Sequence, residues 1–254
     1  MGSIDERFQS YNVEMAEVIG ASFWKPYSAD TNAILDRQQG QSGSGSTPAG
    51  VDANLFEQRA PVDLTDAKLR RLAAALGPAY VRVSGTWANT VFFHDSDAPA
   101  PESPPDGFSG VLTQAQWAGV VRFAEAADAQ LVTSFATGAG TRDAHGVWTD
   151  DQARALINAT RAAGGEIAAA EFMNEPTFAA MGGAPDGYDA AAFGRDVGVC
   201  RRLVARDAPV TIFLGPGSVG EPGWLMLPGT MLRSEDLLAA SSPVFDAFSY
   251  HFYG

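Results

Sequence analysis

Short apolar runs alternate with segments of helical periodicity along most of the chain, and this alternation limits the possible folds more than any other feature. The pattern is typical of repeated βα units around a parallel sheet. Strands are predicted at residues 11–19, 79–84, 131–135, 167–173, 210–214 and 245–251. Helices are predicted at residues 64–76, 113–129, 149–164, 188–206 and 234–240. Two of these helices begin with a capping box, Thr113 with Gln116 and Thr149 with Gln152.

Six strands with intervening helices predict an incomplete (β/α)8 TIM barrel, with about six of the eight βα units present. A doubly wound open sheet also fits the alternation, but no G-x-G-x-x-G or P-loop sequence follows any strand. The notable polar residues gather instead at the carboxyl ends of strands, where a barrel keeps its chemistry. Residues 1–254 contain no interdomain linker, so we expect a single barrel domain, with a low-complexity Gly/Ser-rich stretch at 39–50.

Composition excludes several classes of partner. The net charge of −13 and the pI near 4.5 argue against a nucleic-acid or anionic-membrane partner. No apolar run approaches the ~20 residues of a membrane span, and the first residues show no signal peptide. The single cysteine, Cys200, and three scattered histidines predict no disulfide framework, no metal site and no cofactor. The cellular location stays undetermined.

The segment Glu171 to Pro176 carries the most specific chemical signal. An apolar run leads into Asn174-Glu175-Pro176, so that a predicted buried strand ends on a carboxyl group. Glycoside hydrolysis needs one carboxylic acid to protonate the leaving oxygen and one carboxylate facing it. Glu175 is the candidate acid, and the Asn174 amide could hold a substrate hydroxyl beside the reacting carbon. The alternative is that Glu175 only caps the following loop.

Arg82 and Glu171 form a second pair of candidates. Both fall within predicted parallel strands, where an unpaired charge would be costly. A bidentate ion pair would satisfy both groups and support the floor beneath Glu175. We therefore expect a structural role, with direct contact to substrate as the alternative.

The ends of the first, second and sixth strands offer further candidates. His251 and Tyr253 close the last predicted strand, and a histidine there could orient a catalytic carboxylate or be satisfied in the core. Glu14 on the first strand is an inward-facing carboxylate able to take a sugar hydroxyl. Aromatic residues on the rim loops, at 23–27 and at Trp87, could stack on sugar rings or cover the barrel mouth.

Three motifs together resemble glycoside hydrolase family 79, which contains β-glucuronidases and heparanases. They are Glu171 to Pro176, Pro78 to Thr86 and Tyr250 to Tyr253, and the resemblance covers the chain from its first strand to its sixth. It implies a (β/α)8 barrel followed by a β-sandwich domain, and retaining cleavage of β-linked glucuronic acid.

By match of motif, Glu175 corresponds to the acid/base and Asn174 to the hydroxyl-binding amide. The resemblance also places Thr86 and Glu14 in the sugar pocket and His251 near the nucleophile. In the family the nucleophilic glutamate follows the strand after the His-x-Tyr segment, and this sequence stops at Gly254. The nucleophile, strands seven and eight and the sandwich are therefore expected outside this chain, in a missing C-terminal part of the same protein. The acidic charge fits an exo-acting or small-oligosaccharide β-glucuronidase better than a heparanase.

Three hypotheses follow from the sequence. The first is a retaining β-glucuronidase-like hydrolase with a uronic-acid-containing glycoside as its partner. The second is a truncated, non-catalytic fragment that binds sugars weakly or not at all. The third is a retaining β-glycosidase of another Asn-Glu-Pro family, such as a β-xylosidase or an endoglucanase.

Overall fold

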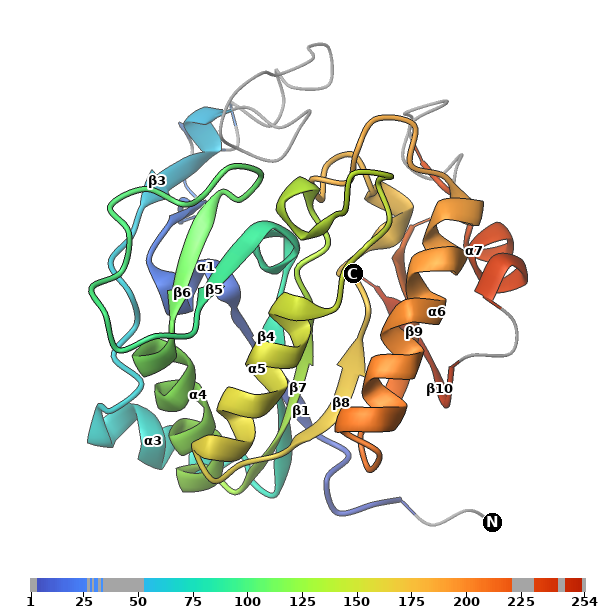
Figure 1. Ribbon diagram of the computed structural model, residues 1–254. Helices are drawn as coiled ribbons and strands as arrows, with labels where there is room; N and C mark the ends of the chain where they lie inside the picture. Colours follow the sequence, from blue (N-terminus) through green and yellow to red (C-terminus); the bar gives the residue numbers. More distant parts are fainter. Residues whose placement is uncertain are drawn as a thin grey trace.

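The main element of the fold is a six-stranded parallel sheet with helices packed on its outer face (Figure 1). The computed structural model describes residues 4–26, 28, 30, 31, 33, 53–220, 231–241 and 245–252. The strands of this sheet, in spatial order, are β1 (Ser10–Glu14), β4 (Ala79–Ser84), β7 (Ala129–Ser134), β8 (Ile167–Glu171), β9 (Ile212–Val219) and β10 (Ala247–His251). All five neighbouring pairs run parallel.

Helices connect successive strands of the sheet. They are α1 (Met15–Ile19), α3 (Ala67–Ala74), α4 (Gln114–Ala126), α5 (Asp151–Ala162), α6 (Ala190–Asp207) and α7 (Ser234–Ser241). Because each strand pairs with the next one along the βα series, the described residues form an incomplete (β/α)8 barrel, as the sequence predicts.

The sheet is strongly curved. Neighbouring strands lie about 4.8 Å apart, so β4 and β10, with three strands between them, would be about 19 Å apart in a flat sheet. Yet Nη2 of Arg82 on β4 lies 3.3 Å from Nε2 of His251 on β10. The carboxyl ends of the strands therefore face one another across a concave surface, as in a barrel wall. Within the described residues β1 and β10 are the two edges of this wall.

Two small sheets accompany the main one. β2 (Ser22–Trp24) pairs antiparallel with β3 (Phe56–Gln58), and β5 (Val91–His94) pairs parallel with β6 (Gly110–Thr113). Aromatic contacts join the β2–β3 ribbon to the segment after β4, with ring centroids 5.5 Å apart for Phe23 and Trp87. The low-complexity stretch at 39–50 lies outside the described residues.

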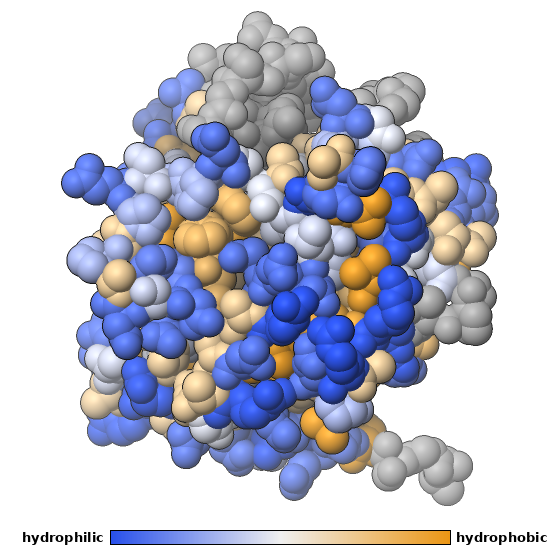
Figure 2. Space-filling model, viewed as in Figure 1, coloured by the Kyte–Doolittle hydropathy of each residue, from blue (hydrophilic) through white to orange (hydrophobic). Residues whose placement is uncertain are grey.

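The core lies between the convex face of the sheet and the helices. Val81, Val83 and Leu131 from the strands pack with Trp117 of α4 and Cys200 of α6, all buried. The prediction that Cys200 fills core space is confirmed. Figure 2 shows that hydrophilic residues dominate the face that α4, α5 and α6 cover, with apolar residues in small separate groups. None of the described helices is both long and apolar enough to cross a bilayer.

Four predictions of local structure are wrong. The first strand ends at Glu14 rather than Ile19, because Glu14 and Glu17 form a capping box that starts α1. β8 ends at Glu171 rather than residue 173. The fifth predicted strand, 210–214, is β9, which begins at Ile212 and continues to Val219. The predicted capping box at Thr149 is absent, since Thr149 Oγ1 donates to the carbonyl of Thr141 and the Gln152 side chain accepts from the Phe93 amide. The capping box of Thr113 with Gln116 is confirmed.

Candidate active site at the carboxyl end of the sheet

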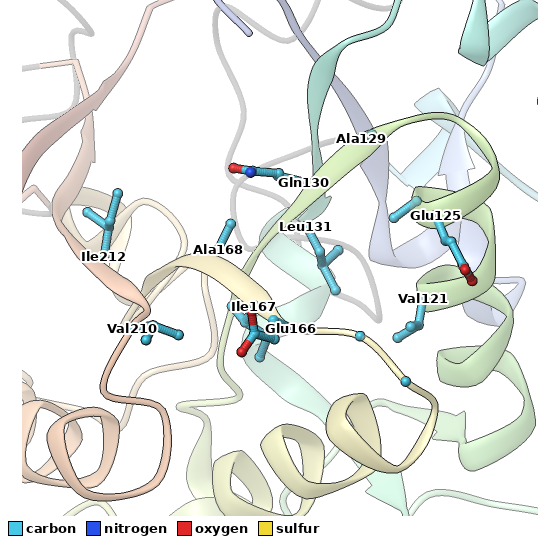
Figure 3. Close-up of a pocket in the computed structure, with 13 residues that line it drawn as sticks. Val121, Glu125, Ala129, Gln130, Leu131, Glu166, Ile167, Ala168, Val210 and Ile212 are labelled. Atoms are coloured by element: carbon cyan, nitrogen blue, oxygen red, sulfur yellow. The ribbon is translucent and has the colours of Figure 1, made fainter.

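The polar residues that the sequence singled out meet at the carboxyl end of the parallel sheet. Arg82 comes from β4, Glu171 ends β8, Asn174 and Glu175 follow directly, and His251 ends β10. Parallel strands present their carboxyl ends at one edge, so side chains distant in sequence converge there. A hollow at the opposite, amino-terminal end of β7, β8 and β9 is lined by mainly apolar residues together with Glu125, Gln130 and Glu166, and it contains none of this cluster (Figure 3).

Arg82 organises the cluster through its guanidinium group. Nη2 donates to Glu171 Oε2 at 2.7 Å and to Asn174 Oδ1 at 2.8 Å, and Nε approaches the same Glu171 oxygen at 3.3 Å. Nη1 donates to Asn12 Oδ1 at 3.3 Å. The expected ion pair is present, but both donors reach one carboxylate oxygen, so it is not the two-oxygen fork expected from the sequence. The second oxygen of Glu171 is thereby left for another donor.

That donor is His251, whose ring lies between two carboxylates. Nε2 is 3.2 Å from Glu171 Oε1, and Nδ1 is 3.0 Å from Glu175 Oε1. Each of these carboxyl oxygens can accept a hydrogen bond from a ring nitrogen that carries a proton. Burial disfavours the charged ring, but the hydrogen bonds to Glu171 and Glu175 outweigh it and raise the pKa of His251 to about 9. At neutral pH an imidazolium therefore bridges the ends of β8 and β10.

Glu171 is correspondingly held as an anion. Its side chain is only 3% exposed, and burial opposes ionisation. The hydrogen bond from His251 and the charge of Arg82 prevail and lower the pKa of Glu171 to about 2. Two cations and their anion thus form a fixed charged floor at this end of the sheet.

Glu14 has the opposite electrostatic environment at the end of β1. Burial raises the pKa of Glu14 to about 7, although Arg82 and the hydrogen bond from Asn12 act in the other direction. Asn12 Nδ2 donates to Glu14 Oε1 at 2.6 Å. The other oxygen lies over Gly85, where φ is 101° and a Cβ would come within 1.6 Å of it, so a side chain there would be strained and would displace the carboxyl group. The site therefore contains a carboxyl group that changes charge near neutral pH.

The turn after β8 places Glu175 by its backbone as well as its side chain. Glu175 has φ 53° and ψ 58°, a left-handed conformation uncommon for a residue with a Cβ. Its amide donates to the carbonyl of Gly217 at 3.1 Å. The preceding residue, Asn174, is held through its backbone by the side chain of Asn89. These contacts fix the direction in which Glu175 leaves the strand.

The structure brings together most of the predicted site residues and adds two. Arg82, Glu171, Asn174, Glu175 and His251 are linked by direct contacts. Thr86 begins the short helix after β4 and is partly exposed at the same end of the sheet. Tyr253 lies outside the described residues. The two residues that sequence reasoning missed are Asn12 and Asn89.

A metal centre is not apparent in the part of the chain that the structure describes. No group of three or more His, Cys, Asp or Glu side chains among those residues is arranged to hold a metal ion. The cluster instead has the composition of an acid–base site, with carboxyl groups, an imidazole, a guanidinium and amides.

No protein-family model matches the chain, and no curated protein matches it. Among solved structures it is similar to the catalytic domain of GH30 xylanase C from Talaromyces cellulolyticus, with a TM-score of 0.45 and 12% identity over 74% of this chain and 49% of the other. It is also similar to BuGH86 in complex with neoagarooctaose, with a TM-score of 0.42 and 13% identity over 76% and 36%. For the β-glucosidase from Trichoderma harzianum the TM-score is 0.39, with 13% identity over 87% and 49%.

These similar structures are glycoside hydrolases. The chain spans about half or less of the length of each.

Proposed function

We propose that this chain carries the acid/base part of a retaining glycoside hydrolase that acts on β-linked glucuronic acid. The observation that supports the proposal most strongly is the position of Glu175. It follows β8 at the carboxyl end of the sheet, and His251 and the turn fix its orientation. The Asn174 amide beside it and the Glu14 carboxyl across the curved sheet complete a polar surface suited to a sugar.

In the proposed mechanism Glu175 protonates the glycosidic oxygen as the bond to the sugar breaks. A carboxylate nucleophile attacks the anomeric carbon and forms a glycosyl-enzyme intermediate. Glu175 then accepts a proton from the water that hydrolyses this intermediate. His251 orients the Glu175 carboxyl through Oε1, and Arg82 holds the Asn174 amide toward the sugar hydroxyl next to the reacting carbon.

We also propose that further βα units close the barrel and supply the nucleophile. In the described residues β10 pairs with β9 alone. Phe248, Tyr250 and Phe252 alternate with His251 and are 65%, 38% and 73% exposed. They lie on the face opposite His251, which in a barrel is covered by helices. An exposed aromatic row on this face suits a packing partner.

Two matched substitutions, one beyond each end of β8, test the role of Glu175. Aryl β-glucuronide, β-glucoside and β-xyloside are offered to a protein that carries this chain together with the proposed nucleophile segment, and to its Glu175→Gln and Glu166→Gln variants. The second variant alters a carboxyl group at the opposite end of β8. We expect glucuronide turnover, with a 10²- to 10⁴-fold lower rate in Glu175→Gln and no change in Glu166→Gln. Azide should restore cleavage in Glu175→Ala by giving a β-glycosyl azide, because in a retaining site a small anion can replace the water.

Each alternative predicts a different result. Turnover of the glucoside or xyloside in place of the glucuronide would assign the site to another Asn-Glu-Pro family. Glucuronide turnover by residues 1–254 alone would contradict the proposal that a further segment supplies the nucleophile. Equal rates in the parent and in Glu175→Gln would rule out Glu175 as the acid/base.

A further inference from the structure

Asn89 is a fully buried residue in the short helix Thr86–Thr90, directly after β4. Both polar atoms of its side chain bind the backbone of one residue, Asn174. Nδ2 donates to the Asn174 carbonyl at 3.0 Å, and the Asn174 amide donates to Oδ1 at 3.0 Å. The side-chain amide therefore pairs with Asn174 as a peptide group of a neighbouring strand would.

The position of this contact explains why it is needed. The ladder of β8 stops at Glu171, which is paired with Ser134 on one side and Leu214 on the other. Buried backbone groups beyond that point need other partners, because leaving them unpaired costs free energy. Asn174 is only 2% exposed, so water does not readily replace the Asn89 amide. Asn89 thus extends the hydrogen bonding of the strand as far as the residue before Glu175.

Asn89 also connects two neighbouring loops to this point. Its carbonyl accepts from the amides of Thr137 and Gly138, both at 2.8 Å, in the segment after β7. A Cβ at Gly182 would come within 2.6 Å of Asn89 Nδ2, so the segment after Glu175 packs closely on the same amide. The ends of β4, β7 and β8 are therefore fixed relative to one another through one side chain and its carbonyl.

We propose that Asn89 is a positioning residue of the site, which sets the Asn174–Glu175 peptide so that Glu175 reaches His251 and Asn174 reaches Arg82. Its importance for catalysis rests on the proposed function of Glu175. The role requires asparagine in particular, because the side chain must donate and accept at once. Aspartate of equal size only accepts when ionised, and glutamine would set its amide one methylene group further from the backbone.

The test uses the His251 ring as a reporter of where Glu175 lies. The chain has three histidines, so the background His94→Gln/His145→Gln leaves His251 as the only titrating imidazole in an NMR experiment. In Asn89→Ala the Glu175 carboxyl should move away from Nδ1, and the His251 titration midpoint should fall by about one pH unit. Asn89→Asp keeps the size and the acceptor, and its His251 midpoint should fall by less. It replaces Asn89→Ala in the test if Asn89→Ala does not fold.

Thr160→Val is the matched control. Thr160 is also buried and accepts from Trp117 Nε1 at 2.8 Å, between α4 and α5 and away from the site. It should lower the melting temperature as the Asn89 variants do, but leave the His251 midpoint unchanged. A His251 midpoint that moves in the Asn89 variants alone supports positioning.

An unchanged midpoint in a folded Asn89 variant would overturn the proposal and leave Asn89 a structural residue. The result is independent of sugar chemistry. If the parent chain neither binds nor cleaves glucuronides while the midpoint still moves, the proposed function fails and the positioning role stands.

Discussion

Two arginine–carboxylate pairs with buried carboxylates have similar chemistry and different surroundings. Arg142 Nη1 donates to Asp196 Oδ2 at 2.6 Å, with side chains only 4% and 0% exposed. Tyr188 and Arg195 also donate to Asp196, and the Arg142 guanidinium lies 4.8 Å from the centre of the Tyr188 ring. In the pair at the site the side chains of Arg82 and Glu171 are 21% and 3% exposed.

The difference lies in what else each pair contacts. The Asp196 cluster joins the loop after β7 to α6, and its donors converge on one carboxylate. The Arg82 cluster reaches a histidine and a second carboxyl group, Glu175, which face the concave side of the sheet. A buried ion pair therefore does not identify a functional site by itself. The protonatable neighbours at the carboxyl end of a parallel sheet make the distinction.

The largest expected effect is on stability, in the Asp196 cluster. Asp196→Ala leaves the Arg142 charge buried without its carboxylate, and should lower the free energy of unfolding by about 3–5 kcal/mol. Glu171→Ala should cost less, because Arg82 is partly exposed and keeps Asn174 and Asn12 as acceptors. Urea denaturation at pH 6 measures both. A larger loss in Glu171→Ala would reverse the proposed contrast.

The second effect is a pH dependence specific to the site. The low pKa of Glu171 stabilises the fold above its ordinary value of 4.5, and this contribution is lost as the pH falls from 4.5 to about 2. It amounts to about 3 kcal/mol. The high pKa of His251 stabilises the fold below 6.5, and is lost as the pH rises to about 9. The raised pKa of Glu14 likewise favours the folded state below pH 4.5, and this contribution is lost as the pH rises from 4.5 to about 7.

Stability should therefore be greatest near pH 4.5 and fall as the pH rises, first through about 7 with Glu14 and then through about 9 with His251, measured as the urea midpoint across pH. His251→Gln should flatten the alkaline part of the profile, while Thr160→Val should shift the whole curve without changing its shape. An alkaline loss that persists in His251→Gln would assign it to other groups.

The third effect compares two glycines of positive φ. Gly85 and Gly146 have φ of 101° and 73°, but only Gly85 lies against Glu14. Gly146→Ala should cost about 1 kcal/mol from strain alone. Gly85 also has ψ 175°, in a region essentially limited to glycine, so Gly85→Ala adds both strain and a clash and should cost about 2–3 kcal/mol. Thermal unfolding compares them, and equal losses would show that neither the backbone at Gly85 nor the Glu14 carboxyl resists a side chain there.

The smallest effect concerns one hydrogen bond of the Asp196 cluster. Tyr188→Phe removes the donor 3.1 Å from Asp196 Oδ2, while Arg142 and Arg195 still neutralise the carboxylate. A loss of about 1.5 kcal/mol is expected, with no change in the His251 titration. A shift of His251 in this variant would mean that the two clusters are coupled.

Local signals in the sequence predicted much of this fold. β4 occupies the predicted residues 79–84, and α4 begins after its predicted capping residue, Thr113. Both depend on neighbours within a few positions. The same locality explains the first error, since the apolar residues 15–19 suit a strand until the capping contact between Glu14 and Glu17 is known.

The end of β8 could not be predicted in this way. β8 ends at Glu171. Three residues further on, the side chain of Asn89, 85 residues earlier in the sequence, binds the backbone of Asn174 in place of a neighbouring strand. An asparagine in a turn carries no sign of such a contact in a single sequence. Its only hint is its place five residues beyond β4, at the end of the sheet where polar groups gather. The sequence identified Arg82, Glu171, Asn174, Glu175 and His251 as candidates, and only the three-dimensional arrangement showed how Asn89 and Asn12 support them.

The left-handed backbone at Glu175 has a consequence for any mutational library at this position. Replacement by valine or isoleucine changes the charge and also demands a conformation that β-branched residues resist. Asparagine, aspartate and glycine tolerate the turn, so they report on chemistry with less interference from folding. The substitutions that position 175 accepts should therefore depend on whether the new residue can adopt a left-handed backbone as much as on its side-chain chemistry.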